Sequence, residues 1–490
     1  MSDIVVLVYP KTGMDIGSTV APPHNLLCVA APLEKAGYSV KIIDQRVDYL
    51  WRFSLANELD EKPIFVGIPT MTGTQTKFAM EIARTIREYS KVPIVWGGAH
   101  PTLLPEQVLD SGLADHVCVG EVDETIVKIT DDISKGKAER IIINPLPDVE
   151  KLLPTPWHLI DIEKYVHPDI YLKGGRNLDV GQTSRGCPFS CGFCSSASIR
   201  QRKWRPMSSE KALDMIGTAI VKFDLDGFWL RDDEFYIDSQ RAARIAEGLI
   251  PFKIKYYTSG TRVDVFNKTP EEQVVLYKRS GADTLKFGAE SGCNRILKLM
   301  NKGITKEETL EANLKARRHG ITPCFALMLG FPTETFAEME ETIDMTKQIR
   351  KDNPDAQFEA MVTYTALPGT PMWSMAIEHG LKPPQKLEEW IDWNFDDYDQ
   401  EGKKIPWFNK KDRQSIANIC SLSILSNALP NIIDSLENPI ESKLLQLAYV
   451  LPHKCYQWRF FDKHYKHTWE LNVLRKIRER IFYSGDKTYR

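Results

Sequence analysis

The rest of the chain is interpreted from one stretch, Gly186-Cys187-Pro188-Phe189-Ser190-Cys191-Gly192-Phe193-Cys194. Its cysteines, Cys187, Cys191 and Cys194, follow the spacing C-x3-C-x2-C. Three thiolates this close together can hold three irons of a [4Fe–4S] cluster and leave the fourth iron open as a reaction site. The alternatives are a zinc site or chance clustering. Zinc usually takes a fourth nearby ligand, and the nearest other candidate, His167, lies well upstream.

Composition limits the class of protein. The chain has 490 residues, enough for two or three domains, and its 42% hydrophobic and 26% charged residues are ordinary for a globular protein. A net charge of -3 gives no general attraction to nucleic acid, so we expect no nucleic-acid partner. The nine cysteines show no disulfide pairing pattern, which predicts a reducing cytoplasmic location. The apolar start of the chain lacks a basic region and a cleavage site and is predicted to be a strand rather than a signal peptide.

Residues 1–144 are predicted to form a doubly wound parallel sheet, because short apolar runs alternate with amphipathic helical stretches. The predicted strands cover 4–8, 40–43, 64–68, 94–96 and 116–119. Such sheets bind ligands beyond the carboxyl ends of their strands. Thr70-Met71-Thr72-Gly73 follows the third strand, and Gly97-Gly98 follows the fourth. Hydroxyls can bond a polar ligand and glycines let the backbone approach it, although a plain strand-to-helix turn explains the glycine pair equally well.

Residues 145–177 are rich in proline and are predicted to be a linker. Residues 178–385 are predicted to form a partial (β/α)6 barrel with its functional groups at the carboxyl ends of the strands. The six predicted strands cover 178–183, 227–231, 255–259, 284–289, 324–329 and 358–363. The cysteine stretch follows the first strand, and the later ends carry Asp232-Asp233-Glu234, Glu290-Ser291 and Gly330-Phe331. Helix N-caps are an alternative role for Asp232 and Asp233.

Residues 386–490 are predicted to be a mostly helical cap or substrate region. The aromatic and acidic segment 390–408 could be a lid, a wall of a substrate cavity or an edge packed on the barrel, and 411–437 and 441–450 have helical spacing. Residues 454–490 mix basic and aromatic side chains. Such a segment can contact a membrane surface or a partner protein, or can simply be a helical cap with a solvated basic face.

The cysteine stretch resembles the signature of radical S-adenosylmethionine (SAM) enzymes, C-x3-C-x-(aromatic)-C, with Phe193 in the aromatic position. The resemblance implies that SAM is the second cofactor. Arg262 also matches a family position and could be only an ion-pair partner. The family usually reads G-F-P-G-E where this chain has Thr333 in place of the second glycine. The residues implied to contact SAM are Phe193, Asp232, Asp233, Glu234, Arg262, Glu290, Ser291, Gly330 and Phe331.

Residues 1–144 resemble the cobalamin-binding domain that precedes many radical SAM domains, in the runs 22–23, 30–37, 97–102 and 120–121. Many cobalamin proteins bind cobalt through the histidine of D-x-H-x-x-G. Here Asp15 and His24 lie in the matching loop without that spacing, so we expect no histidine on cobalt. The residues implied to contact cobalamin are Thr70, Met71, Thr72, Gly73, Gly97, Gly98, His100, Gly120 and Glu121.

The resemblance covers about residues 1–390 and is specific for cofactors rather than for substrate. It implies a C-methyltransferase in which SAM yields a 5′-deoxyadenosyl radical, methylcobalamin methylates an unactivated carbon, and a flavodoxin or ferredoxin supplies electrons. The same cofactors also serve cyclases, oxidases and rearrangement enzymes, including the anaerobic magnesium-protoporphyrin cyclase. An alternative of another class is a non-catalytic cobalamin and Fe–S sensor. The substrate stays open between a small molecule, a lipid and a peptide.

Overall fold

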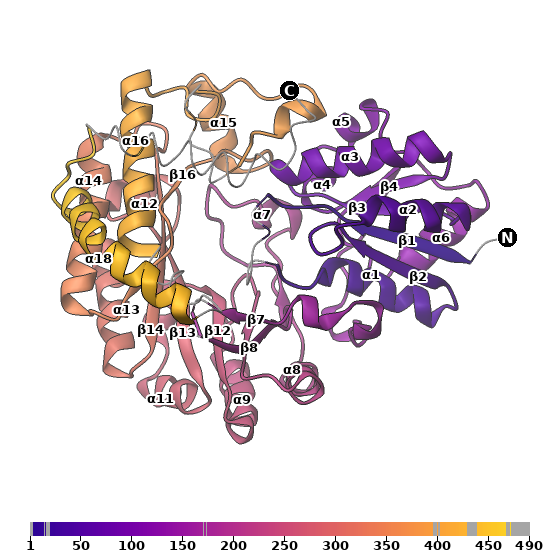
Figure 1. Cartoon of the computed structure of the whole chain (residues 1–490). Helices are drawn as coiled ribbons and strands as arrows, with labels where there is room; N and C mark the ends of the chain where they lie inside the picture. The colour runs from indigo at the N-terminus through magenta and orange to yellow at the C-terminus, as the bar shows by residue number, and fades with distance from the viewer. Residues whose placement is uncertain are drawn as a thin grey trace.

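The computed structural model describes residues 3–13, 15, 20–169, 171–172, 174–394, 399, 402–428, 439–466 and 471. Two sheets with their own helices lie side by side, and the short helix α7 (Ser196–Ile199), which follows the cysteine loop, lies between them (Figure 1). This is the predicted fold class. Residues 429–437 of the predicted helical segment 411–437, and the basic aromatic segment after residue 466 except Leu471, lie outside the described residues, while the predicted helical segment 441–450 falls within a described helix.

The first sheet has six parallel strands in the order β2-β1-β3-β4-β5-β6. Alternate residues of β1 face opposite sides, so Val5 and Leu7 pack against α1 and α6 while Val6 and Val8 pack against α2 and α3. The strand order reverses between β1 and β3, the point where such sheets bind ligands. The elements are β1 (Ile4–Tyr9), α1 (His24–Lys35), β2 (Ser39–Asp44), α2 (Trp51–Asp60), β3 (Val66–Pro69), α3 (Thr74–Tyr89), β4 (Ile94–Gly97), α4 (Ala99–Leu103), α5 (Pro105–Asp110), β5 (His116–Val119), α6 (Ile126–Ser134) and β6 (Ile141–Ile143).

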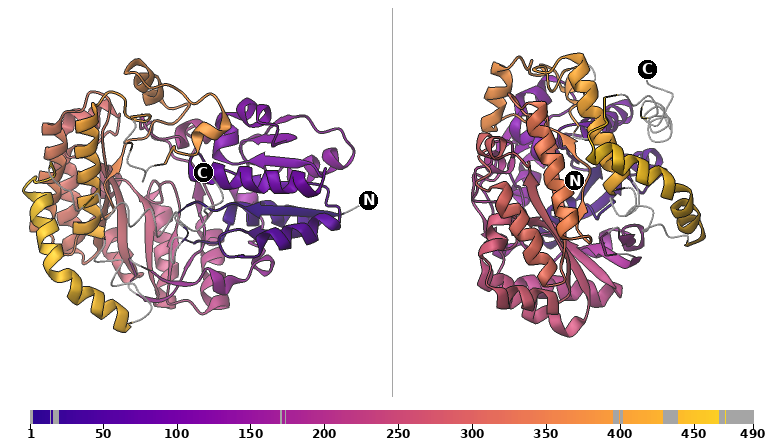
Figure 2. Two further views of the ribbon diagram at one scale, coloured as in Figure 1. Left: turned by 45° about the horizontal axis from the view of Figure 1, so that its top comes forward. Right: turned by 90° about the vertical axis from the view of Figure 1, so that its left-hand side faces the viewer.

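The second sheet curls into a half-barrel whose helices cover its outer side (Figure 2). Six of its strands run parallel in chain order, β7 pairs antiparallel with β8 at one edge, and β16 pairs with the end of β14. The strands are β7 (His167–Asp169), β8 (Gly174–Asp179), β11 (Gly227–Leu230), β12 (Lys255–Thr261), β13 (Ala282–Glu290), β14 (Thr322–Leu329), β15 (Gln357–Phe358) and β16 (Val362–Thr363). The helices are α8 (Ser209–Phe223), α9 (Ser239–Leu249), α10 (Val263–Lys268), α11 (Glu271–Arg279), α12 (Asn294–Leu299), α13 (Lys306–Arg318) and α14 (Phe336–Asp352).

The first barrel strand differs from its predicted bounds of 178–183. It begins at Gly174, within the predicted linker, and ends at Asp179. The end has a local cause, because Gly181 has a φ of +98° and its N–H donates to the Asp179 carboxylate at 2.8 Å. This turn replaces the extended backbone that the apolar pattern predicted. The predicted strand 358–363 is likewise divided into β15 and β16.

The segment after the barrel crosses back to the first sheet. The turn η6 (Leu387–Trp390) packs against α3, and Trp390 Nε1 donates to Gln107 Oε1 at 2.7 Å. Asn394 Oδ1 accepts from the Thr74 N–H at 2.6 Å. Residues 387–394 therefore form a strap, defined here by that range, between the two halves. Helices α15 (Pro371–Glu378), α16 (Lys410–Ser423) and α18 (Pro439–Phe461) complete the described chain. Among these described helices, none is both long and apolar enough to cross a bilayer.

Candidate cofactor site

A cavity of about 1030 Å³ connects the carboxyl ends of the first sheet with the cysteine loop. Gly97, Gly98 and Gly120 line it from the first sheet, and Cys194 and Asp233 line it from the barrel. The cavity also extends along one face of the first sheet as an apolar slot. That slot runs between the strands and helices α1 and α6 and is lined by Leu7, Leu26, Val29, Phe65, Val95 and Ile126.

This cavity fits a large ligand with a flat head and a side arm that ends in an aromatic base, as cobalamin has. The deciding position is Gly97, where an added Cβ would meet only the Cys118 Cβ, at 3.9 Å, and would otherwise stand in open space. Gly98 is different. It has a φ of +99°, and a Cβ there would lie 2.9 Å from the backbone of Thr70. Gly97 therefore keeps the cavity open, while Gly98 allows the turn itself.

Five of the nine predicted cobalamin residues line this cavity, namely Met71, Gly97, Gly98, Gly120 and Glu121. The other four, Thr70, Thr72, Gly73 and His100, do not. Thr72 Oγ1 and His100 Nδ1 are 3.0 Å apart, and a Cβ at Gly73 would lie 2.3 Å from Asn394 of the strap. His100 is fully buried against Trp390, and burial lowers its pKa to about 4. These residues support the turn and the strap rather than the cavity.

His24 lines the cavity from the start of α1. Its Nε2 lies 3.1 Å from the Asp179 carbonyl oxygen and 3.3 Å from the Asp179 carboxylate, and its ring packs edge-on against Trp157. These contacts tie the imidazole to the end of the first barrel strand. They engage Nε2, one of the two ring nitrogens.

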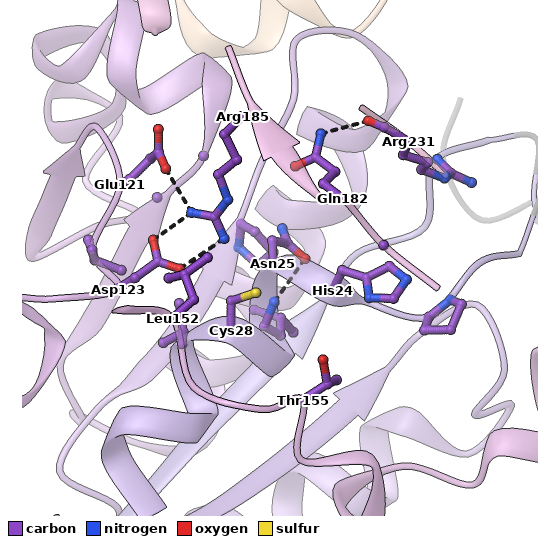
Figure 3. A pocket seen from close by; sticks show the side chains of 18 of the residues that line it. His24, Asn25, Cys28, Glu121, Asp123, Leu152, Thr155, Gln182, Arg185 and Arg231 are labelled. Carbon is purple, nitrogen blue, oxygen red and sulfur yellow. Dashed lines mark hydrogen bonds and ion pairs between the residues drawn. The ribbon is translucent and has the colours of Figure 1, made fainter. Parts of the chain in front are cut away.

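A cluster of ion pairs joins the two halves beside the cavity (Figure 3). Arg185, two residues before Cys187, donates to Asp123 at 2.9 and 3.0 Å and to Glu121 at 2.7 Å. Glu121 also pairs with Arg200 and with Arg205, the latter at 2.5 Å. Burial opposes the charge of Glu121, but Arg200 and the other two guanidiniums lower its pKa to about 2. Sequence reasoning missed the three arginines, because nothing local shows that they meet the loop after β5.

The cysteine loop is held in place by backbone contacts to the barrel. The Gly192 N–H donates to the Met300 carbonyl oxygen at 2.7 Å, and its own carbonyl oxygen accepts from the Met372 N–H at 2.9 Å. Arg262, predicted for SAM, instead contacts this loop. Its Nη1 donates to Cys191 Sγ at 3.4 Å, and its guanidinium lies 3.7 Å from the centre of the Phe189 ring. The same guanidinium also pairs with Asp264 through Nε at 2.9 Å, so it is held between Asp264 and the cysteine loop.

The predicted acidic group after β11 mainly holds the approach to the cysteine loop. Asp232 is buried and accepts from Thr183 Oγ1 at 2.9 Å, and Asp233 accepts from the Gly186 N–H at 2.8 Å. Glu234 is fully buried, accepts from the Tyr236 N–H at 3.1 Å, and has a pKa raised to about 8 by burial. Among these three, Asp233 lines the large cavity.

A second cavity of about 280 Å³ opens beside the cysteine loop and is the candidate SAM pocket. Phe193, Cys194 and Glu290 line it together with Val362 and Leu367, so it offers an aromatic wall, apolar surface and a carboxylate. The sequence analysis missed Lys302, whose Nζ donates to Glu290 at 2.6 Å and lies 5.6 Å from the Phe193 ring centre. The Met300-Asn301-Lys302-Gly303 run carries no chemical signal that pairs it with Glu290.

The remaining predicted SAM residues support this pocket from behind. Ser291 is fully buried and accepts from the Cys293 N–H at 3.1 Å. Glu334 accepts from the N–H groups of Gly330 and Phe331, at 2.6 and 3.0 Å. Thr333 adopts a φ of +67°, so the turn forms with threonine in the left-handed region where the family usually has glycine.

The half-barrel carries a three-cysteine loop at its functional edge, and this loop faces the glycine turn of the doubly wound sheet. This arrangement defines the class of radical SAM proteins that have a second cofactor domain. Comparison with known proteins agrees. The model of the radical SAM superfamily matches residues 182–346, and the model of the B12-binding domain matches residues 17–130. An uncharacterized methyltransferase from Pyrococcus horikoshii is 30% identical over 409 residues, covering 77% of this chain and 84% of the relative. The chain belongs to the radical SAM enzymes with a B12-binding domain, whose cofactors are a [4Fe–4S] cluster, SAM and cobalamin.

Other relatives and solved structures agree with this assignment. The anaerobic magnesium-protoporphyrin IX monomethyl ester cyclase from Rubrivivax gelatinosus is 25% identical over 70% of this chain and 64% of its own. The cobalamin-dependent radical enzyme OxsB, solved with aqua-cobalamin and SAM, has a TM-score of 0.71 at 20% identity, over 93% of this chain and 72% of its own. The methyltransferase TsrM from Kitasatospora setae has a TM-score of 0.66 at 17% identity, over 98% of this chain and 100% of its own. These two structures share the fold.

Proposed function

We propose that the protein methylates an unactivated carbon, as a cobalamin-dependent radical SAM C-methyltransferase. The observation that carries this proposal is that one cavity is lined by the glycine turn of the B12-binding half and by Cys194 of the cluster loop. A substrate in that cavity would lie within reach of both cofactors. The relationship to a protein named as a methyltransferase, over 84% of that relative, supports the same reaction class.

The cluster with SAM supplies hydrogen abstraction when bound, and cobalamin supplies the methyl group. The residues of the chain hold and orient these groups. Cys187, Cys191 and Cys194 are proposed to bind three irons, and Arg262 contacts Cys191 and positions it in the loop. Gly97 leaves room for cobalamin, and the strap ties the barrel half to the first sheet.

Radical SAM enzymes generally need a reductant and a small-molecule substrate. For this chain we propose that a flavodoxin or ferredoxin supplies the electrons in a reducing cytoplasm, because reduction of such a cluster needs a donor of low potential.

The proposal is tested by anaerobic reconstitution with iron, sulfide, cobalamin and SAM carrying a trideuterated methyl group. We expect 5′-deoxyadenosine and a candidate substrate that gains a deuterated methyl. A substrate that changes without gaining methyl would favour the cyclase, oxidase or rearrangement alternative. Protein that binds both cofactors but never cleaves SAM, with or without substrates, would favour the sensor alternative.

A further inference from the structure

At the barrel end of the large cavity lies an arginine, Arg231, whose Nη donors have no partner among the described residues. Arg231 follows β11 directly and lines the cavity, and Figure 3 draws it beside Gln182, whose amide donates to the Arg231 carbonyl oxygen at 2.7 Å. Its Nε pairs with the Asp179 carboxylate. Among the described residues, its two Nη atoms have no hydrogen-bond partner, and 48% of the side chain is exposed. Because Arg231 lines the cavity, these exposed donors are available to a ligand bound there.

Asp179 fixes the orientation of this arginine. Its carboxylate is fully buried at the end of β8, accepts from the Gly181 N–H at 2.8 Å and lies 3.3 Å from His24 Nε2. A buried carboxylate held by two other neighbours cannot follow a mobile partner, so it holds the guanidinium by its Nε edge. The planar fork of the two Nη atoms is then presented in one direction, which is the geometry that recognises a carboxylate or a phosphate.

Another arginine of the same cavity shows the contrast. Arg46 also lines it, but its Nε and Nη2 donate to Asp44 at 2.9 and 2.6 Å, and Nη2 also donates to the Ala21 carbonyl oxygen at 2.7 Å. Its guanidinium lies 4.1 Å from the centre of the Tyr9 ring. Arg46 is therefore committed to the protein, whereas Arg231 keeps two nitrogens for a ligand.

We infer that Arg231, oriented by Asp179, binds an oxyanion group of the substrate, either a carboxylate or a phosphate or phosphonate. This inference rests on the proposed function, because it places the substrate in the cavity shared by Gly97 and Cys194. It restricts the substrate to compounds that carry such an anion at one end. The carbon to be methylated then lies in the space between this anchor and the two cofactor regions.

The experiment uses the cobalamin-loaded, cluster-containing full chain and two small probes, methylphosphonate and acetate. Saturation-transfer NMR on the methyl protons of each probe reports binding whether or not cobalamin is present. Paramagnetic relaxation by cob(II)alamin in the same sample then reports whether the bound probe lies near cobalt. We expect saturable binding of at least one probe with enhanced relaxation, and an affinity about tenfold or more lower in Arg231→Gln. The probe that binds better identifies the class of anion.

Two further variants keep the result interpretable. Arg231→Gln leaves Asp179 without its partner, so Asp179→Asn combined with Arg231→Gln removes both charges together. Arg52→Gln is the matched control, because Arg52 is 51% exposed and paired with Glu81 but lies on α2 outside the cavity. The double variant should fold and still lose probe binding, and the control should bind like the wild type. Equal binding by wild type and double variant would overturn the inference.

Two other results would also overturn it. Displacement of the probe by SAM would assign Arg231 to the SAM carboxylate, and loss of cobalamin from the double variant would assign it to the cobalamin phosphate. Failure of the proposed function gives a different pattern. In that case the probe still binds and depends on Arg231, while no substrate gains a methyl group.

Discussion

Arg185 donates through both Nη atoms to the carboxylate of Asp123, at 2.9 and 3.0 Å. Arg185 belongs to the approach to the cysteine loop, and Asp123 belongs to the loop that follows the fifth strand of the B12-binding half. The contact between the two cofactor regions is therefore made by paired charges with fixed geometry, not by apolar surface alone. Two parallel N–H···O bonds resist rotation as well as separation.

The first prediction concerns Glu121, which faces Arg185, Arg200 and Arg205. Its pKa is lowered to about 2, so its contribution to stability is complete above the ordinary value of 4.5 and is lost as pH falls through about 2. We expect Glu121→Gln to reduce the free energy of unfolding by roughly 3 kcal/mol at pH 7, and by less as the pH is lowered below 4.5. Thermal unfolding of the wild type and the variant at several pH values from 7 to 3 measures the loss of stability and its decrease with pH.

Glu163→Gln is the matched control for this prediction. Glu163 pairs with Arg176 at 2.8 Å, but its side chain is 60% exposed, so its loss should change stability far less than the loss of Glu121. The prediction would be wrong if the two variants lost equal free energy of unfolding. It would also be wrong if the effect of Glu121→Gln did not change between pH 7 and pH 3.

The second prediction concerns the glycine turn. Gly97→Leu should fill the cavity without disturbing the fold, because a Cβ there meets nothing closer than 3.9 Å. We expect the variant to keep its melting temperature and its cluster while its cobalamin content falls about tenfold or more, measured by absorbance after reconstitution. Gly98→Ala should instead lower stability by about 1–3 kcal/mol, because its φ is +99° and the Cβ would clash with Thr70. Normal cobalamin binding by folded Gly97→Leu would argue against cobalamin at this turn.

The third prediction concerns the cluster. Cys191→Ala should abolish cluster absorbance and SAM cleavage but leave the chain folded, because the loop stays anchored by the Gly192 backbone contacts to Met300 and Met372. Cys293→Ala is the control, since Cys293 is also buried but lies outside the loop, and it should retain both properties. Deoxyadenosine formation by Cys191→Ala at the wild-type rate would refute the assignment.

The fourth prediction concerns the lower face of cobalt. We expect no histidine ligand, because Asp15 and His24 lack the D-x-H-x-x-G spacing and because His100 does not line the cavity. The spin-resonance signal of the cob(II) state should then lack the triplet splitting that a nitrogen ligand produces. His24→Ala and His100→Ala should leave the signal unchanged. Triplet splitting that disappears in either variant would identify that histidine as the ligand.

The sequence predicted five of the six strands of the first sheet, because each of the five is a short apolar run, which is a local pattern, but it missed the edge strand β6. It misplaced the first barrel strand because Gly181 and the Asp179 carboxylate form a turn inside an otherwise apolar run. It also left the G-F-P-T-E turn in doubt. Arg295 donates to the Thr333 carbonyl oxygen at 2.8 Å and holds threonine in the left-handed conformation.

Some residues of the candidate site could likewise be predicted from the sequence and others could not. The cysteines and the glycine turn were readable because their spacing carries the chemistry. The partners that complete the site were not readable. Lys302 reaches Glu290 from a different element, and Arg205 reaches Glu121 across the interface between the two halves. Such pairs depend on how distant elements pack together, and local patterns in a single sequence do not indicate that packing.

The strap has a consequence for how the chain is made. Leu387 is buried in the core of the first sheet, and Trp390 covers His100 and bonds to Gln107. The first sheet leaves the ribosome long before these residues do, because more than 200 residues of barrel are synthesised in between. During that interval its α3 side lacks its final apolar cover. Completion of this core therefore waits for translation of the barrel, and nascent chains stalled before residue 387 should be the forms most in need of a chaperone.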